Sequence, residues 1–196
     1  MSDFQKLIIQ GRAVSIREAK PGDISAIDAM HDRLSRQSLY LRYFASRKPS
    51  LESLEDQLLD PQGGGAAYVA VLEGRWVEVL GLAYYRQVPG KAGSAEPAVL
   101  VEDRFQGYGL GQALMDVLIR QARCQVIRSF KAYVLPENQR VLHMFAKQGL
   151  PVKRRYRDGL YELEMNLQPT SVNAVFPQEA SAPVSSSKID MCMDFV

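Results

Sequence analysis

The stretch from Arg104 to Met115, RFQGYGLGQALM, places three glycines at alternate positions beside a helical pattern of apolar residues. A glycine inside a helix costs about 1 kcal/mol relative to alanine. Gly107, Gly109 and Gly111 should therefore either precede the helix or serve a purpose that offsets this cost. Apolar residues recur at helical spacing from Leu110 onward, and the preceding residues read as a strand. The pattern predicts a strand, a glycine-rich turn and the start of a helix.

A turn of this kind has two interpretations. The unpaired amides and the dipole at a helix start favour an anion, and glycines let a phosphate approach the backbone. The alternative is a tight turn that only needs permissive backbone. Other phosphate-binding motifs fit worse, because a P-loop would continue as Gly-Lys-Ser/Thr after Gly111, and a dinucleotide fingerprint would need glycine in place of Gln112.

The rest of the chain predicts further elements around this turn. In chain order these are a strand at 13–18, helices from Ile24 and after Ser50, strands at 66–74, 76–88 and 97–103, the helix from Leu110, a strand at 129–135, a helix at 138–148, and a hairpin at 151–167. Asp23 is the expected N-cap of the first helix, and Ser50 or Ser53 that of the second. The predicted domain is 1–168, followed by a flexible Pro/Ser/Ala-rich tail at 169–196.

Composition excludes several classes of protein. A formal net charge of +2 does not argue for binding to nucleic acid or to an anionic membrane. No apolar run approaches the roughly 18 residues of a membrane span, and the N-terminus lacks the pattern of a signal peptide. The two cysteines, Cys124 and Cys192, have no neighbours at metal-ligand spacing, so we expect no metal site and a reducing compartment, the cytoplasm.

The glycine stretch fits the pattern Arg/Gln-x-x-Gly-x-Gly/Ala twice, starting at Arg104 and at Gln106. This resembles the acyl-CoA signature of the GNAT N-acetyltransferase superfamily. LPENQRVLHMFAKQGLPV is similar to that family's later strand end and fourth helix, and the resemblance covers about residues 12–167. SLYLRYF (38–44) and AEPAVLVEDRFQGYGLG look like the GNAT domain of bacterial protein-lysine acetyltransferases. The regulatory domain often fused to those enzymes is not expected here, so nucleotide regulation is not inferred.

The resemblance implies a fold of the α/β (α+β) class. The central sheet would be mixed but mostly antiparallel, with about seven strands splayed at the cofactor site and about four flanking helices. It also implies acetyl-CoA as co-substrate. The implied contacts come from Val99, Leu100 and Val101 along the pantetheine arm, from Gln106, Gly107, Tyr108, Gly109, Leu110, Gly111 and Gln112 at the pyrophosphate, and from Asn138.

Several of these residues keep a second interpretation. Val99, Leu100 and Val101 would contact the cofactor only through their backbone, and the amide of Val99 or Leu100 would be the oxyanion donor. The alternative is that these residues only form a core strand. Asn138 would bind cofactor or cap its helix.

The resemblance implies Glu96, expected just before the strand, as the general base. A solvated loop glutamate beside Pro97 is the alternative. Glu102 and Asp103 are weaker candidates, since carboxylates beside a phosphate site repel the ligand unless they turn to solvent. Phe145 stands where many relatives carry a proton-donating tyrosine, so no general acid is identified and water is the remaining donor.

These implications lead to a predicted function. The chain would be an acetyl-CoA-dependent N-acetyltransferase that acetylates a primary amine, a protein lysine or a small molecule, by direct transfer in a ternary complex. No cysteine near the turn supports an acyl-enzyme. A second copy of the chain, in a homodimer, is a further partner left open. The alternative is a non-catalytic GNAT-fold module that binds or senses acyl-CoA.

Overall fold

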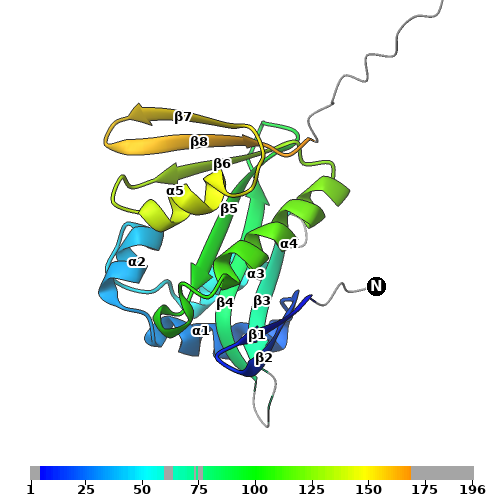
Figure 1. The fold of residues 1–196 in the computed structure, drawn as a ribbon, viewed down its shortest axis with the longest axis vertical. Helices are drawn as coiled ribbons and strands as arrows, with labels where there is room; N and C mark the ends of the chain where they lie inside the picture. Colours follow the sequence, from blue (N-terminus) through cyan, green and yellow to red (C-terminus); the bar gives the residue numbers. More distant parts are fainter. Residues whose placement is uncertain (1–4, 60–63, 73, 75–76, 169–196) are drawn as a thin grey trace, which may run out of the picture.

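The computed structural model describes residues 5–59, 64–72, 74 and 77–168. These residues form one open sheet, ordered β1-β2-β3-β4-β5-β6-β8-β7, with helices on both faces (Figure 1). The strands are β1 (Gln5–Ile9), β2 (Arg12–Glu18), β3 (Ala66–Leu72), β4 (Glu78–Gln87), β5 (Ser94–Val101), β6 (Ser129–Val134), β7 (Val152–Arg157) and β8 (Leu160–Asn166). The helices are α1 (Ile24–Asp32), α2 (Arg36–Tyr43), α3 (Leu51–Leu59), α4 (Leu110–Cys124) and α5 (Gln139–Ala146).

This architecture confirms the predicted mixed and mostly antiparallel sheet, since β5–β6 is its parallel pair. The sequence patterns missed one strand and one helix among the described residues. β1 pairs with β2 through a Gln10-Gly11 turn in which both residues have positive φ, a geometry usually signalled by Asn-Gly. α2 begins after Ser35, whose hydroxyl oxygen accepts a hydrogen bond from the Ser38 amide.

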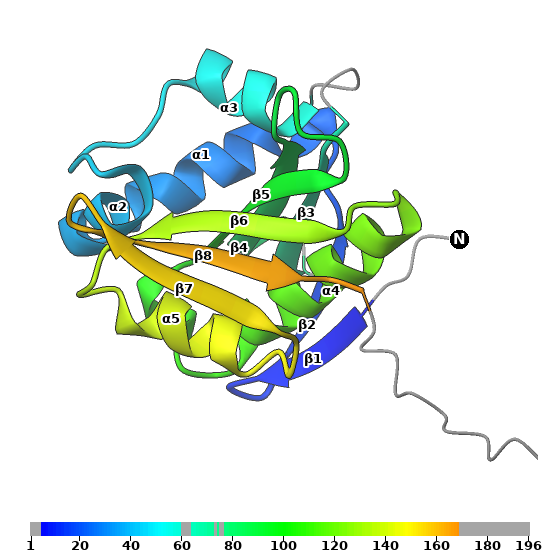
Figure 2. The same cartoon turned by 90° about the horizontal axis from the view of Figure 1, so that it is seen from above.

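Helices α1 and α3 lie on one face of the sheet and α4 and α5 on the other (Figure 2), and each face carries its own hydrophobic core. One core contains α4 and α5, and the other contains α1 and α3. The apolar residues that predicted α4 are all buried: Leu110, Leu114, Val117 and Leu118. The sheet thus separates a side covered by α4 and α5 from a side covered by α1 to α3.

The sheet opens between β5 and β6. These strands pair only at Ser94↔Ser129 and Ala95↔Phe130, whereas β5 stays paired with β4 from Ala95 to Val101. Hydrogen bonds from Val88 N to Ser94 O and from Glu102 N to Leu80 O show which residues face β4. Because the pattern alternates along an antiparallel pair, the peptide groups of Val99 and Val101 face the gap. The predicted splay is therefore present.

Pro97 explains why the start of β5 was placed too late. The sequence analysis began this strand at Pro97 and put Glu96 in the preceding loop, but β5 begins at Ser94 and contains both residues. By the same alternation the nitrogen of Pro97 faces the gap, so its missing N–H breaks no bond to β4. A proline can thus occupy the middle of this strand.

Other predicted boundaries have mixed outcomes. Ser50 caps α3, because its Oγ accepts from the Ser53 amide. Asp23 does not cap α1 with its side chain, which instead accepts from Arg17 and from the Lys20 amide. The closing hairpin turns at Asp158-Gly159 as predicted.

The predicted turn at 73–75 and the tail at 169–196 fall on positions outside the described ranges, apart from Gly74. Within the described residues, no helix is long and apolar enough to cross a membrane.

Candidate active site

A cleft of about 470 Å³ lies where the sheet opens. Its walls come from β5, β6, the β5–α4 loop, the start of α4, α2 and α5. The predicted site residues that line it are Glu96, Val99, Leu100, Val101, Gln106, Gly107, Gly109, Gly111, Gln112 and Asn138. The remaining two do not line it, because Tyr108 is exposed outside the cleft and Leu110 turns its side chain into the core. The cleft brings together segments that are far apart in the sequence.

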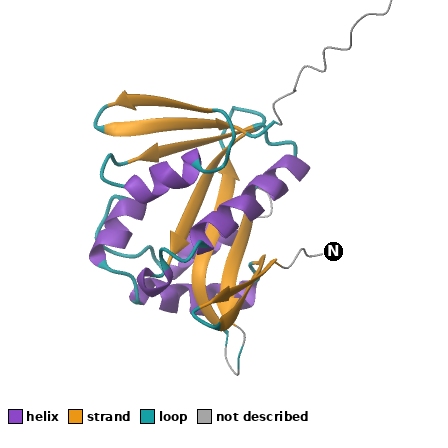
Figure 3. Ribbon diagram, in the orientation of Figure 1, coloured by secondary structure: helices purple, strands orange, loops and turns teal. Residues whose placement is uncertain are grey.

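The glycine turn lines one end of this cleft. It lies in the loop that joins β5 to α4 (Figure 3). Gly107 and Gly109 have φ of +84° and +83°, and Gly109 is the N-cap of α4. A Cβ on Gly109 would meet nothing within 4 Å, so protein packing does not explain this glycine; its backbone conformation does. Gly111 lies in the first turn of α4, where a Cβ would come within 3.7 Å of Val101 and 3.8 Å of Met144. A side chain there would narrow the cleft.

The side chain of Gln106 holds the turn in place. Its Nε2 donates to the carbonyl of Val101 at 2.9 Å and to Ser38 Oγ at 3.3 Å. Its Oε1 accepts a hydrogen bond from Arg140 of α5. The sequence analysis expected Gln106 only as a contact to the pyrophosphate. The structure adds a side chain that joins β5, α2 and α5 around one end of the cleft.

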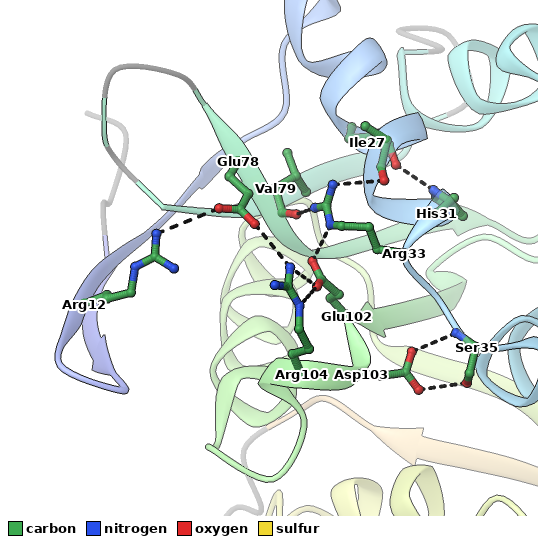
Figure 4. A network of polar contacts seen from close by, with 11 residues as sticks. Arg12, Ile27, His31, Arg33, Ser35, Glu78, Val79, Glu102, Asp103 and Arg104 are labelled. Carbon is green, nitrogen blue, oxygen red and sulfur yellow. Dashed lines mark hydrogen bonds and ion pairs between the residues drawn. The ribbon is translucent and has the colours of Figure 1, made fainter.

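Two carboxylates next to the turn are neutralised by neighbouring groups. Glu102 is completely buried, and its oxygens accept from Arg33 Nε at 2.8 Å and Arg104 Nε at 2.5 Å (Figure 4). Asp103 accepts from the amide of Ser35 at 3.0 Å and from two serine hydroxyls. Neither carboxylate lines the cleft. The expectation that they would have to turn to solvent is wrong, because internal donors compensate their charge.

The pKa of Asp103 reflects this environment. Burial raises the pKa of this carboxyl, and the hydrogen bonds from Ser35 and Ser38 outweigh burial, so the pKa lies below its ordinary value. A serine pair at the start of α2 thus stabilises the ionised form. The resulting contacts also fix α2 against the segment that leads into the glycine turn.

The other end of the cleft lies beside the beginning of β5. Glu96 is exposed there, and in register it stands opposite Arg86 of β4. Arg42 of α2 and Tyr133 of β6 line the same region. The sequence analysis did not assign a role to Arg42, although its spacing of four residues from Ser38 places both on one face of a helix. That spacing was the available signal.

Asn138 and Phe145 belong to α5. Asn138 Oδ1 accepts from the Val141 amide at 3.3 Å, so this residue caps α5, the alternative interpretation given above. Its Nδ2 also lies 3.5 Å from the carbonyl of Leu41, which connects α5 to α2. Phe145 is buried in the core with its ring bordering the cleft. It cannot donate a proton.

Comparison with known proteins identifies the family. Residues 28–150 match the model of the acetyltransferase (GNAT) family. The chain belongs to the GNAT acetyltransferase family. It is 29% identical over 134 residues to the acetyltransferase Pat of Mycolicibacterium smegmatis, a match that covers 68% of this chain and 40% of the relative. The chain therefore spans less than half of that curated relative.

Solved structures of acyltransferases share the fold of this chain. The GNAT domain of S. lividans PAT has a TM-score of 0.73 at 25% identity, covering 83% of this chain and 96% of that domain. A mutant form of a cAMP-binding acyltransferase from Mycobacterium smegmatis has a TM-score of 0.56 at 25% identity, and the match covers 90% of this chain and 51% of that one. At 21% identity and a TM-score of 0.63, yncA of Salmonella typhimurium, solved with its cofactor acetyl-CoA, shares the fold; the match covers 81% of this chain and 96% of yncA.

Proposed function

We propose that the protein is an acetyl-CoA-dependent N-acetyltransferase that transfers an acetyl group directly to a primary amine. The observation that carries this proposal is the meeting of an open β-strand edge and a glycine-rich helix start in one cleft. An extended amide-bearing chain can add to such an edge. A pyrophosphate can bind at such a helix start. Acetyl-CoA carries both groups.

The peptide groups of Val99 and Val101 are the proposed contacts along the pantetheine arm. The carbonyl of Val101 already accepts from Gln106, so the N–H groups and the carbonyl of Val99 offer the open positions. The amide of Leu100 faces β4 by the strand alternation, which leaves the Val99 amide as the donor toward the thioester oxygen. The turn from Gln106 to Gln112 takes the pyrophosphate.

Glu96 is the proposed general base. An alkyl ammonium has a pKa of about 10.4 and must lose a proton before it can attack a carbonyl. Glu96 lies three residues from Val99, on the part of β5 that borders the gap. The acceptor would approach from the side of α1 to α3, opposite α4. Glu102 does not compete for this role, since both of its oxygens are engaged by arginines.

Water is the proposed proton donor to the leaving thiolate. Phe145 has no proton to give, so the proton that the thiolate takes up after the C–S bond breaks would come from solvent. A protein lysine is the proposed acceptor, supported by the motifs shared with protein-lysine acetyltransferases. The part of the chain that the structure describes contains no cluster of three side chains that could hold a metal ion.

One experiment separates this function from its alternative. Isothermal calorimetry measures the affinity for acetyl-CoA, and a thiol-release assay then screens small amines and cell protein as acceptors. Binding with acceptor-dependent thiol release supports the enzyme. Binding without release above the rate of hydrolysis supports a non-catalytic acyl-CoA-binding module. An absence of binding refutes both.

A further inference from the structure

Arg42, in the last turn of α2, is held between two aromatic rings. Its guanidinium lies 4.9 Å from the ring centroid of Tyr43 and 5.4 Å from that of Tyr84. Its Nη2 donates to the hydroxyl of Tyr84 at 2.5 Å. Tyr43 is fixed in turn, because its hydroxyl lies 2.7 Å from Nε2 of the buried His31. Arg42 is therefore held in a defined position rather than extended into solvent.

No carboxylate among the described residues pairs with Arg42. Other arginines nearby do have such partners, as Arg33 does with Glu102 and Arg17 with Asp23. The Nε of Arg42 is buried and finds no hydrogen-bond acceptor within the described ranges. A buried donor left without a partner is unfavourable and calls for an explanation. The described part of the protein thus leaves the charge of Arg42 uncompensated.

The position of Arg42 relates it to the reacting end of the cleft. Arg42 lines the cleft, and the ring that holds it belongs to Tyr84, which pairs in register with Ala98. Ala98 is the neighbour of Val99 and lies two residues from Glu96. Side chains of Tyr84 and Glu96 share one face of the sheet as diagonal neighbours, with Cα atoms about 7–8 Å apart. The cation thus lies on the proposed acceptor side, close to the proposed base.

Exposed aromatic residues complete this end of the cleft. Phe44, which follows Arg42 by two residues, and Tyr133 of β6 both line it and are about half exposed. Apolar ring surface suits the methylene stem of an alkyl amine. An acceptor would then have its amine at Glu96, its stem against the rings and a negative group at Arg42.

We propose that Arg42 recognises a carboxylate carried by the amine acceptor. This rests on the proposed function and specifies its substrate class: amines that bear a carboxylate a short distance from the reacting nitrogen. A guanidinium recognises a carboxylate through charge-assisted hydrogen bonds, and Arg42 lines the cleft without a carboxylate partner among the described residues. The carboxylate has two sources, an acidic side chain beside a target lysine or the α-carboxylate of a free amino acid.

Matched acceptors test the proposal and distinguish these sources. One pair is a peptide with a single lysine next to glutamate, and the same peptide with glutamine. The other pair is Nα-blocked lysine and its amide. The wild-type enzyme should favour the carboxylate member of at least one pair by about tenfold or more in kcat/KM, the effect of one hydrogen bond to a charged group. The pair that responds identifies the source.

The variant Arg42→Gln should abolish this preference by raising KM for the carboxylate acceptor. Arg42→Lys, which keeps the charge and loses the planar fork, should retain part of it. Arg36→Gln, an exposed arginine of the same helix, is the matched control and should leave the preference unchanged. Equal use of both members of each pair by the wild type would overturn the proposal, and so would a preference that survives in Arg42→Gln.

A second readout keeps the proposal testable if no acetyl group is transferred or the Gln variant fails to fold. The Nε–H resonance of Arg42 in the wild-type protein is followed while each member of the two acceptor pairs is added in turn. A shift with a carboxylate acceptor that its neutral counterpart does not produce supports carboxylate recognition even if the proposed enzymatic function fails. A resonance that does not distinguish the two members of either pair refutes the proposal, whatever the activity.

Discussion

The two ends of the cleft differ in whether their charged side chains have partners within the protein. At the end formed by the glycine turn, Glu102 and Asp103 are compensated by arginine and serine donors, and the Gln106 side chain is bonded on both sides. At the other end, Glu96 is exposed and Arg42 has a donor without an acceptor among the described residues. The first end is internally satisfied. The second leaves a carboxylate and a cation available to a ligand.

The difference teaches where the two substrates would be recognised. A site for a fixed, common ligand such as a pyrophosphate benefits from rigid backbone amides, so nearby side chains serve to hold the turn. A site for a particular acceptor needs side chains that only the correct molecule satisfies, because an analogue leaves their polar groups unpaired. Glu96 and Arg42 fit the second description.

The largest expected effect comes from removing the available carboxylate. Glu96→Gln should lower turnover by about 10² to 10⁴-fold, because the acceptor would lose its general base. Affinity for acetyl-CoA should stay within about twofold. Steady-state kinetics and calorimetry measure the two quantities. Glu52→Gln, an exposed residue of α3, is the control and should match the wild type. Equal turnover of Glu96→Gln at every pH would assign the base elsewhere.

Removing the compensated carboxylate should affect stability more than catalysis. Glu102→Gln leaves Arg33 and Arg104 without their buried carboxylate partner, and losing a hydrogen bond to a charged group costs about 1.5–3 kcal/mol in the free energy of unfolding. Denaturant titration measures this loss. Glu78→Gln is the control, since Glu78 is partly exposed and its nearest arginine nitrogen lies 3.5 Å away; it should change stability by less than about 1 kcal/mol. Similar losses for both would show that burial of Glu102 does not matter.

The glycine turn gives an effect of intermediate size on affinity. Gly109→Asn puts a side chain where a phosphate would approach, and asparagine tolerates the positive φ better than most residues. Acetyl-CoA affinity should fall by at least about tenfold, or 1.4 kcal/mol. Gly149→Asn is the control, because Gly149 has the same open surroundings and a φ of +65° but does not line the cleft. This variant should bind acetyl-CoA as the wild type does. A folded Gly109→Asn protein with normal affinity would remove the turn from the site.

The smallest expected effect is a change in the pH dependence of stability. The pKa of Asp103 is lowered in the folded protein, so its contribution is present above the unfolded-state value of about 3.9 and is lost as the pH falls through the folded-state value. Unfolding free energies measured from pH 5 to pH 2 should fall less steeply for Asp103→Asn than for the wild type. The difference in slope corresponds to the uptake of at most one proton on unfolding. An unchanged slope would contradict the role given to Ser35 and Ser38.

Local sequence patterns were enough to predict much of this arrangement. The glycine spacing and the apolar repeat from Leu110 correctly predicted the turn and α4, because both depend on neighbours within one helical turn. The predicted site residues that line the cleft lie on β5, in the loop after it, at the start of α4 and at the N-cap of α5. The start of β5 was missed because a proline usually breaks a strand, and only the sheet order shows that Pro97 faces a gap.

Contacts between distant segments could not be predicted in this way. Arg33 and Glu102 are 69 residues apart, and Arg42 and Tyr84 are 42 apart. Nothing in either local pattern indicates the other partner. The compensation of Glu102 and the position of Arg42 depend on how α1 and α2 pack against the sheet. The sequence analysis therefore wrongly expected Glu102 to turn to solvent and assigned no role to Arg42.

The proline in the middle of β5 also bears on what happens before any ligand arrives. Continued pairing with β6 beyond Ala95 would need a hydrogen bond that an imide nitrogen cannot donate. The missing donor at Pro97 thus disfavours pairing of β5 with β6 just beyond Ala95. A ligand that adds to this edge of β5 then does not have to break strand pairing at Pro97, a cost that would otherwise reduce its affinity. A residue without a polar side chain thus helps to preorganise the binding site.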